Sequence, residues 1–239
     1  MKNNQILSII LARGGSKSIT NKNIIDLCEK PLIAYTIIEA KKSKYINRII
    51  VSTDDPKIKS IAIKYGAEVP FNRPKHLATD TATSLDAMIH ATEWCERSEN
   101  KKYDFIVELM CTNPMKTVAD IDGAIEKLIE TKADSVIGMS KLDDKHPARA
   151  KKIVNDRIVD FCVPELSSRR QDLKPEAYIR NGSIYAIKRD VLMVDKIRFG
   201  SKNSRPYLMS EEKSVNIDNE IDLIVAEALM KKRLLNEKK

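Results

Sequence analysis

The sequence predicts an α/β fold in which helices cover both faces of a mainly parallel sheet. Two observations lead to this class. Short apolar runs alternate with stretches of helical periodicity, and the first run, residues 6–11, is almost wholly apolar. Parallel strands are buried on both faces, so they appear as continuous apolar runs. A chain of 239 residues with 42% hydrophobic composition is long enough for one such domain, which we place at 1–239.

The first half of the chain contains the clearest alternation. After the strand at 6–11, Pro31 is expected to open a helix that ends near residue 44, because its fixed φ suits a first helical turn. The next expected elements are a strand at 48–53, a helix at 57–65 with Gly66 as its C-cap, and a short strand at 67–69.

The second half continues the pattern with one interruption. The expected elements are a helix at 84–97, a strand at 105–110, a helix at 118–131, strands at 135–139 and 183–187, and a final helix at 220–235. Between about 141 and 180 the chain becomes basic and rich in proline. There we expect a hairpin with strands at 150–154 and 158–163 and a turn at Asn155-Asp156. This segment is interpreted as an arm that packs against a second subunit.

The net charge of +8 is unevenly distributed. Residues 1–50 hold nine Lys or Arg against three Asp or Glu, and residues 141–200 hold fourteen against nine. A nucleic-acid binder usually combines a basic face with aromatic side chains for stacking, but only 5% of the residues are aromatic. Nucleic-acid binding is therefore the least favoured function, and cationic loops that face anionic substrates are favoured.

Cysteine usage and hydropathy indicate the compartment. The four cysteines form no CxxC pair and, with three scattered histidines, give no zinc spacing. Eighteen apolar residues never run together, and the N-terminus has no small-residue cleavage site of a signal peptide. We expect a cytoplasmic protein with reduced thiols and no membrane association.

A glycine-rich loop at residues 12–17 follows the first buried strand. In a parallel sheet this loop lies at the carboxyl edge, where such folds bind ligands. Its two glycines let backbone amides approach a phosphate, and Arg13, Lys17 and Lys22 can supply charge. The loop matches neither the dinucleotide-binding nor the P-loop pattern, so a plain turn with solvated lysines stays open as an alternative.

A second polar cluster comprises Arg73 and residues 77–84, before a helix. It is equally well explained by a ligand or by helix capping, with Ser84 as N-cap and Asp86 in the first turn.

A third cluster is formed by Asn216 and Asp218, two residues apart on one face of an extended segment. Oxygen ligands suit Mg²⁺, which usually takes one or two carboxylates with phosphates and water. The alternative is helix entry, in which Asp218 or Asn219 caps the final helix and Asp222 lies in its first turn.

The order of these motifs resembles that of the acylneuraminate cytidylyltransferases, the CMP-sialic acid synthetases. The resemblance covers almost the whole chain, in blocks at residues 11–17, 21–23, 30–36, 51–54, 73–80, 170–173, 181–185 and 217–218. It implies a Rossmann-like, three-layer nucleotidyltransferase fold of the glycosyltransferase-A-like kind. It also implies a homodimer held partly by an inserted dimerisation arm at about 141–180.

The resemblance further implies the reaction. A nonulosonic (sialic-acid-like) acid attacks the α-phosphorus of CTP through its anomeric hydroxyl and releases pyrophosphate, with Mg²⁺ as cofactor. The implied site residues are Arg13 and Lys22 as catalytic groups on the triphosphate; Ala12, Gly14, Lys17, Asn23, Arg73 and Ser84 as further nucleotide contacts; Met110, Arg149, Arg170 and Asn181 around the sugar acid; and Asp218 with Asn216 at the metal. Such a transfer requires positioning and charge neutralisation more than covalent catalysis, which Arg, Lys and Mg²⁺ supply.

Three departures from the family pattern concern the acceptor and the metal. Asn216 replaces one of the family's paired acids, which removes one charge from the metal site. The family's Leu-Gln-Pro-Thr-Ser-Pro-Leu-Arg block has Met110 in place of the glutamine, and a thioether cannot make the hydrogen bonds of an amide. One residue is also inserted between Arg170 and Asn181. We therefore hypothesise an acceptor other than N-acetylneuraminate, such as legionaminic or pseudaminic acid. A transferase for a different sugar or base, or a weakened regulatory nucleotide-binding homologue, remains the alternative.

Overall fold

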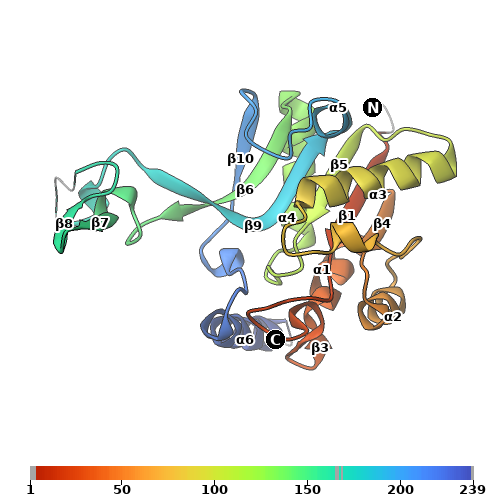
Figure 1. Cartoon of the computed structure of the whole chain (residues 1–239), viewed down its shortest axis with the longest axis horizontal. Helices are drawn as coiled ribbons and strands as arrows, with labels where there is room; N and C mark the ends of the chain where they lie inside the picture. The colour runs from red at the N-terminus through yellow and green to blue at the C-terminus, as the bar shows by residue number, and fades with distance from the viewer. Residues whose placement is uncertain (1–3, 165–166, 168, 238–239) are drawn as a thin grey trace.

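The computed structural model describes residues 4–164, 167 and 169–237, and it is built around a six-stranded sheet (Figure 1). The strand order is β10-β6-β9-β5-β1-β4. The strands are β1 (Ile6–Leu11), β4 (Arg48–Ser52), β5 (Phe105–Leu109), β6 (Ser135–Leu142), β9 (Ala177–Lys188) and β10 (Ser204–Leu208). Because β1 pairs in parallel with both β4 and β5, the carboxyl ends of these three strands meet at one edge of the sheet.

One strand runs against the others. We expected a strand at 183–187 within a mainly parallel sheet, but β9 is antiparallel to both β5 and β6. Residues 183–187 of β9 are all buried, as in a parallel strand, so their apolar pattern gives no information on the direction of the strand. The mixed sheet is otherwise parallel, as predicted.

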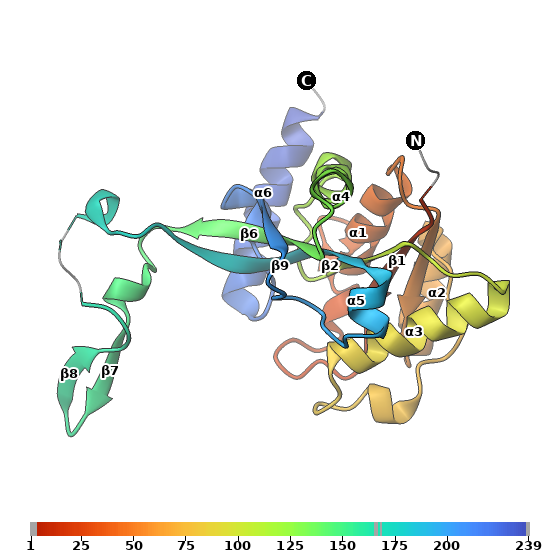
Figure 2. The same cartoon turned by 90° about the horizontal axis from the view of Figure 1, so that it is seen from above.

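Helices cover both faces of the sheet, as the alternation predicts (Figure 2). The helices are α1 (Leu32–Lys41), α2 (Pro56–Tyr65), α3 (Ser84–Glu99), α4 (Val118–Thr131), α5 (Arg189–Met193) and α6 (Glu220–Asn236). One core contains α1, α2 and α4 against the sheet, and the other contains α3 and α5. The last helix, α6, packs on Leu27, Leu32 and Met115, beside the small hairpin of β2 (Asp26–Leu27) and β3 (Lys30–Pro31).

Helix ends follow local chemistry, with two corrections. The side chain of Asp55 caps α2, and Gly66 ends that helix with φ of 94°. The predicted N-cap of α3 was wrong by one residue: Thr83, not Ser84, accepts the backbone N–H of Asp86, at 3.1 Å. Asn219 caps α6, as one of the two expected alternatives. The helix predicted to reach residue 44 ends at Lys41.

Several boundaries differ from those expected. Residues 67–69 form only one bridge, Ile50 to Glu68, rather than a strand. Strands β6 and β9 extend beyond the predicted 135–139 and 183–187, because they continue as a two-stranded ribbon away from the body. The edge strand β10 and the short helix α5 were not predicted.

The predicted hairpin lies at the far end of this ribbon (Figures 1 and 2). It consists of β7 (Lys151–Val154) and β8 (Arg157–Asp160), so its second strand ends before the predicted residue 163. Asn155 and Asp156 turn it with φ of 49° and 61°, the left-handed conformation that a two-residue hairpin loop requires. The hairpin is confirmed, and it projects from the body.

Short 3-10 helices join these elements: η1 (Lys22–Ile24), η2 (Lys75–Leu77), η3 (Pro147–Arg149), η4 (Arg170–Asp172) and η5 (Glu212–Ser214). Among the described residues, no helix combines the length and the apolar character needed to cross a membrane.

Candidate active site

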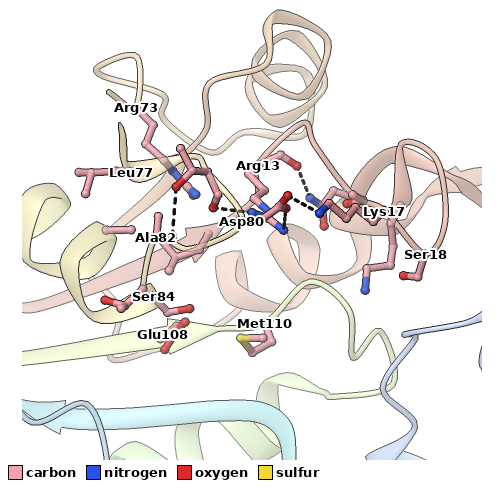
Figure 3. A pocket seen from close by; sticks show the side chains of 17 residues that line it. Arg13, Lys17, Ser18, Arg73, Leu77, Asp80, Ala82, Ser84, Glu108 and Met110 are labelled. Atoms are coloured by element: carbon pink, nitrogen blue, oxygen red, sulfur yellow. Dashed lines mark hydrogen bonds and ion pairs between the residues drawn. The ribbon is translucent and has the colours of Figure 1, made fainter. Parts of the chain in front are cut away.

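A cavity of about 470 Å³ opens at the carboxyl edge of β1 and β5 (Figure 3). Three segments line it: the glycine-rich loop after β1, the polar loop before α3, and the end of β5. The first two are the segments that the sequence singled out as candidate ligand loops. The fold therefore brings together residues that lie some 60 to 100 positions apart in the chain.

Two cations of the glycine-rich loop meet a single carboxylate. The Arg13 guanidinium lies 2.9 Å from one oxygen of Asp80, and the Lys17 ammonium lies 2.6 Å from the other. Arg13 also donates to the carbonyl oxygen of Thr79, at 2.5 Å. The two cations hold the pKa of the Asp80 carboxyl below its usual value, Lys17 having the larger effect. These contacts join the two ligand loops across the mouth of the cavity.

The third cation, Lys22, reaches the segment before α6. Its Nζ lies 2.9 Å from Oδ1 of Asp218, and Nδ2 of Asn216 donates to the other Asp218 oxygen at 2.5 Å. Asn23 anchors the same loop, because its Nδ2 donates to the carbonyl of Arg13 at 2.8 Å and its Oδ1 lies 3.0 Å from Sγ of Cys111. Lys22 and Asn23 both line the cavity.

Of the two glycines in the loop, only Gly14 is required by close packing. A Cβ at Gly14 would lie 2.8 Å from Oδ2 of Asp55, whereas a Cβ at Gly15 would meet no atom within 4 Å. The Gly14 amide donates to Asp54, at 3.1 Å, and Ala12 is buried in the core below the loop. Neither Ala12 nor Gly14 lines the cavity, although both were expected at the nucleotide.

Arg73 and Ser84 also line the cavity (Figure 3). Arg73 is buried, and its guanidinium donates to the side-chain oxygen of Ser52, at 3.0 Å, and to the Ser52 carbonyl. Burial lowers the pKa of Arg73 to about 10, a shift that Asp54 opposes. Arg73 thus remains protonated at neutral pH and fixes the polar loop to the end of β4.

The end of β5 contributes Glu108 and Met110 to the cavity. Both Glu108 oxygens accept hydrogen bonds from Arg198, from Nε at 2.6 Å and from Nη2 at 2.9 Å. Nη2 of Arg198 also lies 3.6 Å from Sδ of Met110. Burial raises the pKa of the Glu108 carboxyl, and Arg198 opposes this shift. A buried, bidentate ion pair therefore forms part of this wall.

A buried lysine supports the same wall from behind. Nζ of Lys116 donates to the Met110 carbonyl at 2.6 Å, to Oγ1 of Thr36 at 3.0 Å and to the Asn113 carbonyl. Burial lowers the pKa of Lys116 to about 7. Three acceptors match the three N–H groups of an ammonium, so Lys116 fixes the loop after β5.

Three expected sugar-acid residues lie outside the cavity. Arg149 and Arg170 belong to η3 and η4 in the arm, where both approach Asp144. Arg170 lines a separate hollow of about 280 Å³ at the arm, together with His146. Asn181 is buried, and its Nδ2 donates to Oγ of Ser214 at 3.0 Å. Of the four residues expected at the acid, only Met110 lines the cavity.

Sequence reasoning did not identify Glu108 or Arg198. The one available signal for Glu108 was a charged residue inside the apolar strand Phe105–Leu109, where an unpaired carboxylate would be costly. Arg198 had no local signal, because its partner lies 90 residues away.

Comparison with known proteins places the chain among nucleotide-processing enzymes. Residues 7–239 match the family model described as cytidylyltransferase. The chain is 34% identical to the CMP-N,N'-diacetyllegionaminic acid synthase of Campylobacter jejuni, over 98% of each chain. It is also 34% identical to a pseudaminic acid cytidylyltransferase of Campylobacter jejuni, over 97% of each. A solved CMP:2-keto-3-deoxy-manno-octonic acid synthetase, complexed with CTP, has the same fold, with a TM-score of 0.71, 19% identity, and coverage of 96% of this chain and 99% of that one.

Proposed function

The chain belongs to the cytidylyltransferase family, and from this premise we propose that it transfers CMP from CTP to the anomeric hydroxyl of a nonulosonic acid. The relatives named for legionaminic and pseudaminic acid match over nearly their full lengths, which supports this class of acceptor. The departures of the sequence at Met110 and Asn216 support an acceptor other than N-acetylneuraminate.

One observation is the main structural support for a triphosphate substrate. Three cations, Arg13 and Lys17 of the glycine-rich loop and Lys22 of η1, line a single cavity at the carboxyl edge of the sheet. Guanidinium and ammonium groups are the side chains that hold phosphates, and this edge is the usual ligand position in such folds. A cavity of about 470 Å³ is in the range of small-molecule sites.

The proposed mechanism needs no nucleophilic side chain. The anomeric oxygen of the acid forms a bond to the α-phosphorus, the bond to the bridging oxygen of the β-phosphate breaks, and pyrophosphate leaves as the hydroxyl gives its proton to water. Arg13, Lys17 and Lys22 would neutralise the charge that develops on the phosphate oxygens, which is the main requirement of phosphoryl-type transfer. Ser84 and Arg73 would hold the nucleoside.

Cytidylyltransferases of this kind are generally metal-dependent, and we propose Mg²⁺ at Asp218 and Asn216. The residues fit this ion: the Asp218 carboxylate is exposed, and Oδ1 of Asn216 is buried without a hydrogen-bond partner among the described residues. Mg²⁺ usually takes one or two carboxylates and completes its shell with phosphates and water. The ion would supply charge neutralisation at the phosphates, while Lys22 and Asn216 hold the Asp218 carboxylate in place.

The arm is proposed to join two copies of the chain. It exposes apolar side chains that would pack on a partner: Ile153 is 78%, Ile158 77% and Phe161 65% exposed. Arg149 and Arg170 lie on this arm rather than in the cavity, so we propose that they approach the sugar acid bound by the second copy. Replacing Ile153 and Ile158 by Ser should yield a monomer in analytical ultracentrifugation, whereas a dimer that persists would exclude the arm as the interface.

The function is tested by incubating the protein with CTP, Mg²⁺ and, separately, N-acetylneuraminate, N,N'-diacetyllegionaminic acid and pseudaminic acid. We expect pyrophosphate and the CMP-linked acid in equal amounts with at least one of the diacetylated acids. Replacing CTP by UTP, ATP or GTP should abolish most of the product. Binding of CTP without release of pyrophosphate in the presence of any of these acids would refute the proposal and favour a regulatory homologue.

A further inference from the structure

We propose that Glu108, held in place by Arg198, selects the acceptor by accepting a hydrogen bond from a hydroxyl or N–H group of the sugar acid. The inference rests on the proposed function and deepens it, because it names a residue that recognises the acceptor.

The pair is built rigidly. Glu108 is 0% exposed and Arg198 is 18% exposed, and two charge-assisted hydrogen bonds link the two side chains. The Arg198 guanidinium also stacks over the ring of Tyr185, at 4.8 Å, and lies 5.3 Å from the ring of Phe199. A carboxylate held this firmly can present its remaining lone pairs in one direction.

A purely structural role does not explain the pair well. The neighbours of Glu108 along β5 are fully buried and apolar, namely Ile106, Val107 and Leu109. A buried ion pair generally stabilises a protein no better than apolar residues of similar volume, because both charges must be removed from water. Arg198 occupies one lone-pair position on each oxygen, and a carboxylate offers about four. Glu108 lines the cavity although its side chain is 0% exposed to water, so we place its remaining positions opposite a ligand group that enters the cavity.

The ligand group that faces Glu108 must be a hydrogen-bond donor. A carboxylate repels the triphosphate and the carboxylate of the acid, so it suits a hydroxyl or an N–H. Such donors occur on the cytosine amine and ribose of CTP and, in larger number, on a nonulosonic acid. The donors for the phosphates, Arg13 and Lys17, come from the other side of the cavity (Figure 3).

A neighbouring cation favours the acid over the nucleoside. The exposed guanidinium of Arg180 lies 3.8 Å from the centre of the Phe199 ring, the same ring that Arg198 approaches. Arg180 and Arg198 thus approach one aromatic ring, and Arg198 in turn holds the buried acceptor Glu108. A molecule with both a carboxylate and several hydroxyl or N–H groups complements this pattern, whereas a nucleoside has no carboxylate.

The test replaces both partners at once, because removing one would leave a buried charge unpaired. In the double variant Glu108→Leu with Arg198→Leu, we measure KM and kcat for CTP and for the acid that the wild type uses among the three named above. We expect kcat/KM for the acid to fall about 100-fold, because the donor group of the acid then enters the site without its hydrogen-bond partner. KM for CTP should stay within about twofold of the wild type.

A matched pair provides the control. Arg189 and Glu96 form a bidentate pair on the same face of the sheet, with bonds of 2.9 and 2.8 Å, outside the cavity. The double variant Glu96→Leu with Arg189→Leu should leave both KM values unchanged. The variant Arg198→Lys retains the charge but not the two parallel hydrogen bonds, so KM for the acid should rise while KM for CTP does not.

Two results would overturn the inference. One is a folded Glu108 and Arg198 double variant with unchanged kinetics for the acid, which would leave the pair a purely structural role. The other is an increase in KM for CTP with an unchanged KM for the acid, which would assign Glu108 to the nucleotide. Failure of the proposed function is a separate result, because the wild type would then convert none of the acids.

Discussion

The substitution Arg198→Leu alone should strongly destabilise the protein. It removes the partner of Glu108, whose side chain is 0% exposed and accepts two hydrogen bonds from Arg198. Leucine fills part of the volume but donates nothing, so the carboxylate would remain buried without its counter-charge.

The size of the effect follows from burial. Breaking a fully buried ion pair typically costs about 3–5 kcal/mol. Arg198 is 18% exposed, so water reaches the vacated position in part, and we expect the lower end, about 3 kcal/mol. For a chain of 239 residues, this loss corresponds to a fall in Tm of about 6–12 °C.

The pH dependence gives the effect a specific signature. Burial raises the pKa of Glu108 in the folded protein even with Arg198 present, and loss of that cation raises it further. The folded variant therefore binds a proton more tightly than the unfolded chain, so its stability rises as the pH falls through the folded-state pKa. The difference in free energy of unfolding between the wild type and Arg198→Leu should therefore become smaller at acidic pH.

Urea denaturation of the wild type and of Arg198→Leu at pH 8 and at pH 5.5 measures both quantities. The double variant that also contains Glu108→Leu should recover most of the lost stability, because no charge then remains buried. A loss below about 1 kcal/mol at pH 8, or a deficit that grows in acid, would show that the carboxylate is not buried as described.

Three further outcomes are expected. Arg13→Ala should lower kcat/KM about 100-fold and leave the circular dichroism spectrum unchanged. Arg205 is an exposed arginine outside the cavity, so Arg205→Ala should have no effect, and equal activity of the two variants would remove Arg13 from the site. Asn216→Asp adds a carboxylate beside Asp218 and should lower the Mg²⁺ concentration for half-maximal activity several-fold in a metal titration, and an unchanged midpoint would place the ion elsewhere. The pKa of Lys116 is lowered to about 7, so above that pH the folded state binds fewer protons than the unfolded state, and the stability of the wild type rises with pH. The free energy of unfolding lost in Lys116→Met should therefore grow by about 2 kcal/mol between pH 7 and pH 9. A loss that stays constant in urea denaturation would contradict this.

The parallel strands at 6–11 and 48–53 were predictable because burial on both faces leaves a continuous apolar run. The edge strand β10 was not, because its sequence, Ser-Arg-Pro-Tyr-Leu, is polar and contains Pro206. Proline is tolerated on an edge, where one side of the strand needs no partner. The antiparallel direction of β9 was also not predictable, because its apolar pattern is the same in either direction.

The candidate site was predictable only where its chemistry is local. Arg13 and Lys17 stood out because they flank two glycines after a buried strand. Their partner Asp80 could be assigned to a ligand loop but not to these cations, since the contact spans more than 60 residues. The positions of Arg149 and Arg170 depend on the path of the arm, which the irregular sequence between 141 and 180 does not specify.

The carboxylate of Asp80 would make binding of the triphosphate an exchange of counter-ions. Under the proposed function, the phosphates must displace Asp80 from Arg13 and Lys17, so the electrostatic gain depends on the charge of the ligand. A triphosphate with about four negative charges would outcompete one carboxylate, whereas a CMP-linked acid, with one phosphodiester and one carboxylate charge, would gain much less. The same aspartate that joins the two ligand loops would therefore help to expel the product, and turnover would be sensitive to ionic strength at both ends of the cycle.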